Sequence, residues 1–337
     1  MNPNENMYDI TIIGGGPVGL FAAFYAGMRQ AKVKIIDSLE NLGGQPGHLY
    51  SEKLIYDIPA YPAITGEDLT INLTDQLKRF DTSFCLGEEA LNIVRFQPEI
   101  DVPYFEIETS KGKHFSRSVI IAAGNGAFQP RKLNVENATQ FESGNLHYYV
   151  NNLDKFRDRV VAICGGGDSA VDWALTLEPI AKKVYIVHRR NKFRALEHSV
   201  SLLESSSVEI LTPYLPVELQ GDGQTIDKVI LNESRTDNVL ALDVDDFIVN
   251  YGFSTSIGKI KTWGLETERN AIKVNQQLET NIPGIYAIGD IAEYPGKVKI
   301  IASGFGEAPQ AVNNALFYID PENITPSIHS TSLFEGE

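Results

Sequence analysis

The chain has few cysteines and no cysteine pair. Its 337 residues include two, Cys85 and Cys164, and neither belongs to a Cys-x-x-Cys motif. Because a structural disulfide or a cysteine-based metal site needs cysteines at suitable spacing, neither feature is expected. Cys164 ends the apolar segment VVAIC, which predicts a small buried core residue.

Long apolar runs and excess positive charge are also absent. No segment approaches the ~20 apolar residues that a membrane-spanning helix requires. The N-terminal sequence MNPNENMYDI has neither the basic start nor the apolar core of a signal peptide, so we expect a cytoplasmic protein. The 29 lysines and arginines against 44 acidic residues give a net charge of −15, which argues against nonspecific binding to nucleic acid.

The first of two glycine-rich motifs follows an apolar segment near the N-terminus. Residues 8–13 (YDITII) are expected to form a buried strand, GGGPVG a tight turn and Leu20 to Gln30 a helix, before a second strand over 32–37. Glycines in such a βαβ unit allow the turn, let a pyrophosphate approach the helix N-terminus and let helix and strand pack closely. The first unit therefore predicts a dinucleotide site.

The binding residues expected in this unit are Gly14, Gly16, Pro17 and Gly19 in the turn and Asp37 at the end of the second strand. Asp37 lies 18 residues beyond Gly19, a position from which an acid accepts hydrogen bonds from the adenosine ribose. A free ribose hydroxyl is therefore expected at this site.

The same order recurs in the middle of the chain, with the opposite charge at its end. A strand over 159–164, the loop GGGDSA, a helix over 171–180 and a strand over 183–188 form the second unit, which leads into the basic segment HRRNKFR. Because guanidinium groups make paired hydrogen bonds to phosphate, we expect this unit to bind NADPH. The residues expected to bind it are Gly165, Gly167, Asp168, Ser169, Ala170, His188, Arg189, Arg190 and Arg194.

A motif near the C-terminus indicates which dinucleotide the first unit binds. The strand IYAIGD ends at Asp290 and resembles the flavoprotein pattern in which an aspartate bonds the ribityl chain. Such a strand would bring Asp290 to the carboxyl edge of the sheet, where ligands bind. A helix beginning near Gly304 would direct its dipole towards the flavin. FAD is therefore the expected ligand of the first unit.

Short connectors divide the chain into two expected domains. Residues 90–121 and 208–249 alternate between apolar and polar side chains, as antiparallel strands do, and each region follows one βαβ unit. The expected domains are a discontinuous FAD-binding domain over 1–120 and 280–337, and an NADPH-binding domain over 121–279 inserted within it.

Together these motifs resemble the low-molecular-weight thioredoxin reductases over almost the whole chain. The resemblance rests on GGGPVG, GGQ at 43–45, GGGDSA, HRRNKFRA and IYAIGD. It implies an α/β fold with two Rossmann-like dinucleotide-binding domains, each a three-layer ββα arrangement. That family reduces a disulfide through a Cys-x-x-Cys pair, whereas the corresponding stretch here, GNLHYYVNN at 144–152, has no cysteine. A dithiol relay is therefore excluded.

A closer resemblance is to the thioredoxin-reductase-like type of ferredoxin NADP reductase, which lacks the dithiol and has a C-terminal extension. The tail HSTSLFEGE resembles the ending of that type. The resemblance implies that Tyr50 stacks on one face of the flavin, that His329 covers the other face and that Ser330 lies at the edge. It also implies a homodimer, in which His329 can come from either subunit. It assigns further FAD contacts to Gly44, Gln45, Ala90, Phe128, Asp290 and Thr331.

The implied activity is electron transfer from NADPH through FAD to ferredoxin or flavodoxin, or the reverse. No side chain is needed as a general acid or base for the hydride step, and no metal is expected. Two alternatives stay open: an NADPH-dependent flavin reductase of another acceptor, such as a quinone, oxygen or a low-molecular-weight disulfide, and a flavin redox sensor without turnover.

The negative charge of the chain complicates docking of such carriers, which are typically acidic. A local basic patch would have to attract them, and the candidates are Arg131, Lys132, Lys297 and Lys299. Attraction of this kind weakens with salt, because the screening length is ~8 Å at physiological ionic strength.

Overall fold

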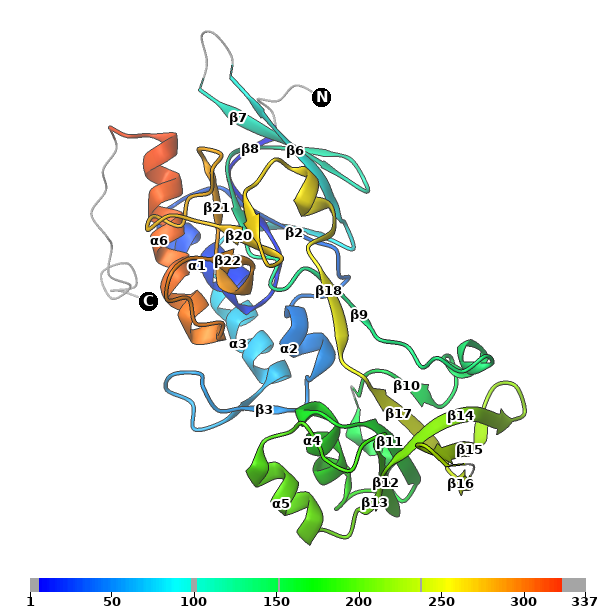
Figure 1. Cartoon of the computed structure of the whole chain (residues 1–337). Coiled ribbons are helices and arrows are strands. Elements are labelled where there is room, and N and C mark those ends of the chain that lie inside the picture. Colours follow the sequence, from blue (N-terminus) through cyan, green and yellow to red (C-terminus); the bar gives the residue numbers. More distant parts are fainter. Residues whose placement is uncertain (1–5, 98–101, 151, 237, 323–337) are drawn as a thin grey trace. The chain divides into compact units, whose positions relative to one another are not determined.

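The computed structural model describes residues 6–97, 102–150, 152–236 and 238–322 (Figure 1). The chain divides into two compact units. Unit 1 comprises Met1–Ala127 and Thr255–Glu337, and unit 2 comprises Phe128–Ser254. The two crossings between the units, β9 (Ala127–Pro130) and β18 (Phe253–Ser256), pair as a two-stranded sheet.

Unit 2 is inserted into unit 1, but the chain returns to unit 1 earlier than the expected boundary at residue 280. The reason is the segment after Ser254, whose apolar side chains pack in the core of unit 1. Trp263 and Ile272 lie in one cluster with Ile36 of the central sheet. The indole of Trp263 also donates a hydrogen bond of 2.9 Å to the Leu91 carbonyl.

A seven-stranded sheet forms the centre of unit 1, in the order β5-β2-β1-β8-β7-β6, with β21 also paired to β8. The pairs among β5, β2, β1, β8 and β21 are parallel, whereas β6, β7 and the first part of β8 form the expected antiparallel meander. The strands are β1 Met7–Ile13, β2 Val33–Asp37, β5 Thr82–Leu86, β6 Ala90–Phe96, β7 Tyr104–Thr109, β8 Lys113–Ile121 and β21 Ile285–Ala287.

Three helices pack on one face of this sheet, as Figure 1 shows. They are α1 Pro17–Met28, α3 Gly66–Leu77 and α6 Ile301–Ile319. Leu20 of α1, Leu73 of α3 and Val312 of α6 share a core cluster with Ile10 and Ile35 of the sheet. On the opposite face, Ile107 of the meander packs with Ile13, so the unit has the expected three layers.

Short elements complete unit 1. They are α2 Gly44–Leu49, β3 Leu54–Ile55, β4 Ile64–Thr65, η4 Gly258–Thr262, β19 Thr267–Glu268, β20 Ala271–Lys273, η5 Gly289–Ile291 and β22 Ala292–Glu293. Helix α3 begins where the Thr65 hydroxyl accepts a hydrogen bond of 3.0 Å from the Asp68 amide, which caps its N-terminus.

Unit 2 has a five-stranded parallel sheet, in the order β10-β17-β11-β12-β13, and a separate antiparallel sheet, β14-β15-β16. The strands are β10 Leu146–His147, β11 Val160–Gly165, β12 Lys183–Val187, β13 Glu209–Leu211, β14 Tyr214–Gly221, β15 Ile226–Glu233, β16 Val239–Asp243 and β17 Asp246–Asn250. The helices are η2 Ala138–Phe141, η3 Leu153–Phe156, α4 Asp168–Leu177 and α5 Glu197–Ser205.

Both predicted βαβ units are present as β1-α1-β2 and β11-α4-β12. Cys164 is buried in β11, as the sequence predicts. Among the described residues, no helix combines the length and the apolar character needed to cross a membrane.

Candidate functional site

The first glycine loop is shaped by the close approach of its own backbone. Gly14 has a φ of +112°, and a Cβ at this residue would lie 2.4 Å from the Ala122 carbonyl oxygen. A Cβ at Gly19 would lie 1.9 Å from the Gly14 carbonyl oxygen, so α1 can approach β1 only because Gly19 has no side chain. Gly16 is the N-cap residue of α1, and Pro17 is its first residue. The free backbone amides at this helix N-terminus can therefore bind an anion.

Asp37 is fixed at the carboxyl end of β2, next to this loop. Its Oδ2 accepts a hydrogen bond of 2.6 Å from the Gly15 amide, and its Oδ1 accepts one of 2.8 Å from the Leu39 amide. Burial raises the pKa of this carboxyl above its usual range, although both amides oppose that rise. Each carboxylate oxygen can accept a second hydrogen bond, so Asp37 can still bind a hydroxyl group.

The GGQ segment lies against the first glycine loop. The Gly43 amide donates a hydrogen bond of 2.9 Å to the Gly15 carbonyl, which joins the two loops directly. Gly44 and Gln45 begin α2, and Tyr50 follows its last residue. The structure therefore brings Gln45 and Tyr50 to the side of unit 1 where the loop Gly14–Gly19 and Asp37 lie.

Tyr50 and Asp290 are neighbours. Burial raises the pKa of Tyr50 to about 12, and the nearby carboxylates of Asp290 and Asp57 contribute, so its phenol is neutral at physiological pH. Asp290 lies in η5, after β21, and its Oδ2 accepts a hydrogen bond of 3.4 Å from the Asn125 side chain. These groups and the glycine loop could hold the two ends of one dinucleotide.

A buried carboxylate supports the Asp290 segment, and the sequence did not single it out. Glu307 of α6 accepts hydrogen bonds of 2.7 Å from the Gly289 amide and 2.6 Å from the Tyr294 hydroxyl, and it also pairs with the Lys297 ammonium group. The available signal was a glutamate inside the otherwise uncharged helical stretch GFGEAPQA.

Lys297 is therefore not the docking cation that its sequence position suggested. Its side chain is 1% exposed and is paired with Glu307. The sequence around Lys297 has no pattern that distinguishes a buried lysine from an exposed one. Only the packing of the folded chain shows that its side chain is buried.

The other three candidates reach the surface. Arg131 is exposed, Lys132 pairs with Glu142 at 2.6 Å, and Lys299 lies 3.8 Å from Glu293.

The second glycine loop joins β11 to α4. Gly165 ends the strand, Gly167 caps the helix, and Ala170 is fully buried at the third position. Asp168 and Ser169 are exposed in the first turn, and the Asp168 Oδ1 accepts a hydrogen bond of 2.8 Å from the Leu196 amide. The loop thus presents backbone amides at a helix N-terminus, as the first loop does.

The basic segment after β12 folds back onto this loop. The Arg194 amide donates a hydrogen bond of 2.6 Å to the Gly166 carbonyl. The His188 ring lies so close to Gly166 that a Cβ there would be 2.1 Å from the imidazole Cε1. Arg189, Arg190 and Arg194 are exposed, so their guanidinium groups are available to an anion at the loop.

His188 packs beside the second glycine loop as an uncharged ring. Its ring stacks on Phe193 with 5.4 Å between the ring centroids. Burial, with the positive charges of Arg189, Arg190 and Arg194, lowers the pKa of His188 below its ordinary value of 6.5. The imidazole is therefore mostly neutral at physiological pH, and the positive charge beside the loop comes from the arginines.

The other residues expected at the flavin site are described only in part. Ala90 begins β6, where it pairs with Thr109 of β7. Phe128 lies in β9, and its side chain is outside the described part of the chain. His329, Ser330 and Thr331 also lie outside the described residues.

Comparison with known proteins agrees with this architecture. Residues 8–315 match the family described as pyridine nucleotide-disulphide oxidoreductase. The chain is 58% identical to ferredoxin–NADP reductase 2 of Listeria innocua, over 99% of this chain and 100% of that protein. It is 56% identical to ferredoxin–NADP reductase 2 of Bacillus pumilus, over 100% of both chains.

Among solved structures, the thioredoxin reductase of Lactococcus lactis matches with a TM-score of 0.74 and 27% identity, over 93% of this chain and 99% of that chain. The fold is thus that of the thioredoxin-reductase-like flavoproteins, with two Rossmann-like domains. The chain belongs to the pyridine nucleotide-disulphide oxidoreductase family and, within it, to the thioredoxin-reductase-like ferredoxin–NADP reductases.

Proposed function

We propose that the protein is a flavoprotein oxidoreductase that passes electrons from NADPH through FAD to ferredoxin, or in the reverse direction. The observation that carries this proposal is the pair of glycine loops with opposite charge beside them: buried Asp37 in unit 1 and exposed Arg189 and Arg190 in unit 2. The chain's relatives named ferredoxin–NADP reductase 2 match it over their full length, which supports the same activity.

The residues of unit 1 fit FAD. The loop Gly14–Gly19, opened by Pro17, would bind the pyrophosphate at the N-terminus of α1. Asp37 would accept hydrogen bonds from the hydroxyl groups of the adenosine ribose, and the backbone near Ala90 would lie beside the adenine. Gly44, Gln45 and Asp290 would hold the ribityl chain and the ring, on which Tyr50 would stack.

The residues of unit 2 fit NADPH. Gly165, Gly167 and Ala170 shape the loop for the pyrophosphate, with Asp168 and Ser169 at the helix start. Arg189, Arg190 and Arg194 would bind the 2′-phosphate that distinguishes NADPH from NADH, while His188 would pack beside them. Bound FAD would supply the redox chemistry, by accepting a hydride and releasing electrons singly. The chain's own residues bind and orient both dinucleotides.

A disulfide relay has no place in this proposal. The two cysteines of the chain, Cys85 in unit 1 and Cys164 in unit 2, are both free thiols. Electrons that reach the flavin must therefore leave from the flavin itself, which suits a one-electron carrier. We extend the proposal to flavodoxin as a second carrier, to action in the cytoplasm and to a homodimer. We also extend it to flavin contacts from Phe128, His329, Ser330 and Thr331.

An anaerobic titration of the purified protein tests this function. NADPH should bleach the flavin absorbance, and oxidised ferredoxin or flavodoxin added afterwards should restore it. Restoration by a quinone or a small disulfide, with none by ferredoxin or flavodoxin, would identify a flavin reductase of another acceptor instead. A flavin that NADPH does not bleach would contradict the proposal and favour a redox sensor.

A further inference from the structure

The turn between β5 and β6 is attached to the strand end that carries Asp37. The Glu88 amide donates a hydrogen bond of 2.9 Å to the Asp37 carbonyl, and the Gly87 amide donates one of 2.8 Å to the Leu39 carbonyl. Strand β5 runs parallel to β2, with Leu86 paired to Asp37. The turn over 86–89 therefore lies at the same carboxyl edge of the sheet as the ribose-binding acid.

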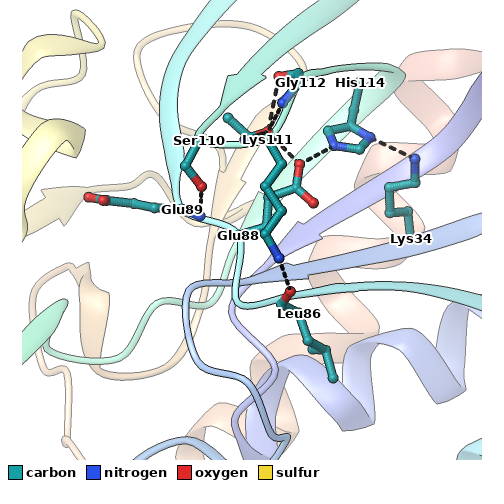
Figure 2. Close-up of polar contacts among 9 residues, drawn as sticks. Lys34, Leu86, Glu88, Glu89, Ser110, Lys111, Gly112 and His114 are labelled. Atoms are coloured by element: carbon teal, nitrogen blue, oxygen red, sulfur yellow. Dashed lines mark hydrogen bonds and ion pairs between the residues drawn. The ribbon is translucent and has the colours of Figure 1, made fainter.

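Buried polar side chains also hold this turn, as Figure 2 shows. Glu88 is 7% exposed, and its Oε1 accepts a hydrogen bond of 2.7 Å from the Nε2 of His114 and another from the Thr109 hydroxyl. The Nδ1 of His114 lies 2.9 Å from the ammonium nitrogen of Lys34, which is also 7% exposed. That ammonium group lies 4.1 Å from the centre of the Tyr8 ring.

We call the hydrogen-bonded chain Lys34–His114–Glu88 the relay. Its donors and acceptors fix which imidazole nitrogen of His114 carries a proton. An ammonium group can only donate, so the Nδ1 of His114 accepts from Lys34 and the Nε2 carries the proton that is donated to Glu88. Burial opposes ionisation of Glu88, but the hydrogen bonds from His114 and Thr109, together with nearby positive charge, lower the pKa of Glu88 overall. The His114 imidazole thus links the buried Lys34 ammonium group to the buried Glu88 carboxylate.

The hairpin between β7 and β8 adds two further contacts to the turn. The Lys111 ammonium group donates a hydrogen bond of 3.1 Å to the Leu86 carbonyl, and the Ser110 hydroxyl accepts one of 3.0 Å from the Glu89 amide (Figure 2). The turn is therefore fixed at both ends by the hairpin and in its middle by Glu88.

Metal binding is the competing use of this cluster. The thiol of Cys85, a carboxylate oxygen of Glu88 and a ring nitrogen of His114 lie within 4.8 Å of one another, a donor set that suits Zn²⁺. However, both ring nitrogens of His114 already have hydrogen-bond partners, because Nε2 faces Glu88 and Nδ1 faces Lys34. Burial also raises the pKa of Cys85, which disfavours the thiolate. The geometry favours a hydrogen-bond relay.

We infer that Glu88, with His114 and Lys34, is a positioning unit that fixes the turn over 86–89 against Asp37 and thereby keeps the adenosine half of FAD bound. The relay does not touch the cofactor; it acts through the backbone of the turn. This inference rests on the proposed function, because it takes FAD as the ligand beside Asp37.

The test measures FAD release from the holoenzyme, followed as the rise in flavin fluorescence after dilution. Glu88→Gln keeps the size of the side chain but removes its charge, and His114→Gln breaks the link to Lys34. Each variant should release FAD about tenfold faster than the wild type, as expected when a charge-assisted hydrogen bond that supports a site is lost. The matched control is His147→Gln in unit 2, whose Nε2 lies 2.8 Å from the buried Asp246, and it should release FAD at the wild-type rate.

A second readout separates positioning from general damage to the fold. With saturating FAD added, the kcat of Glu88→Gln should recover and its KM for NADPH should stay at the wild-type value. Unchanged FAD release in both relay variants, or a kcat that excess FAD does not restore, would overturn the inference. Dialysis of the wild type against EDTA should leave FAD release unchanged; faster release would show that the cluster is a metal site.

Different results would contradict the proposed function itself. A wild-type protein that retains no FAD would contradict FAD as the ligand. An Asp37→Asn variant that releases FAD no faster than the wild type would contradict its placement beside Asp37. Neither result depends on Glu88.

Discussion

In unit 1 the charged group that follows the glycine loop is buried and held in place, since Asp37 is 8% exposed and bonded to two backbone amides. In unit 2 the corresponding groups, Arg189 and Arg190, are exposed. A fixed, desolvated acceptor suits a cofactor that stays bound through many turnovers, because its binding geometry exists beforehand. Exposed guanidinium groups suit a coenzyme that must enter and leave at each turnover. If the two loops bind FAD and NADPH as proposed, the same loop architecture would serve two residence times.

The largest expected effect concerns the buried charges of unit 1. Lys297→Met leaves the Glu307 carboxylate buried without its cation, so we expect the free energy of unfolding to fall by about 3–5 kcal/mol. Urea unfolding measures this loss. The control is Lys299→Met, which removes an ion pair with 3.8 Å between its charged atoms and a 40% exposed lysine side chain, and should cost less than ~1 kcal/mol. Equal losses would show that Lys297 is not buried.

The next effect concerns the acceptor itself. Asp37→Ala removes the partner of the Gly15 and Leu39 amides together with the proposed ribose acceptor, so the FAD dissociation constant should rise about a hundredfold. Flavin fluorescence on equilibrium dilution measures it. Asp222→Ala is the control, because exposed Asp222 also accepts bonds from two backbone amides, those of Gln224 and Thr225. Similar FAD loss in both variants would contradict a specific role for Asp37.

The exposed cations of unit 2 should give a smaller and more selective effect. Replacing Arg189 and Arg190 by Ala should raise the KM for NADPH about tenfold or more while the KM for NADH changes little, because only NADPH carries the 2′-phosphate. Steady-state kinetics with both coenzymes measure the ratio. Lys182→Ala, an exposed cation of the same unit, should leave the ratio unchanged. Equal rises in KM for the two coenzymes would contradict a 2′-phosphate site at Arg189 and Arg190.

The smallest expected effect is a dependence on pH. Hydrogen bonds lower the pKa of Glu88 below its ordinary value of 4.5, so its contribution to stability is present above about pH 4.5 and is lost as the pH falls through the folded-state pKa. The difference in unfolding free energy between the wild type and Glu88→Gln should therefore be larger at pH 7 than at pH 3.5. Urea unfolding at both pH values measures it, and a difference that does not change with pH would contradict an ionised Glu88.

Sequence patterns predict the parts of this protein that are local. The glycine loops, the strands on either side of them and Asp37 lie within short stretches whose spacing has a direct physical meaning, and β1-α1-β2 and β11-α4-β12 are both present. The expected helix at Gly304 is part of α6, which begins earlier, at Ile301, because nothing in the residues before Gly304 stops a helix.

What the sequence does not predict depends on contacts between distant segments. Lys34, Glu88 and His114 come from three different parts of the chain and meet only because β2, β5 and β8 belong to one sheet. Likewise, the boundary after Ser254 is set by the packing of Trp263 against the sheet. Neither arrangement leaves a periodic pattern in the residues themselves.

The insertion of unit 2 also sets the order in which the protein can fold during synthesis. Unit 2 is one continuous stretch, Phe128–Ser254, so all of it is synthesised before the C-terminal part of unit 1. Unit 1 must wait, because β21 and α6, which complete its sheet and cover α1, come last. During this interval the part of α1 that packs against α6 lacks its partner. The nascent chain is therefore expected to depend on chaperones most while residues 255–319 are being translated.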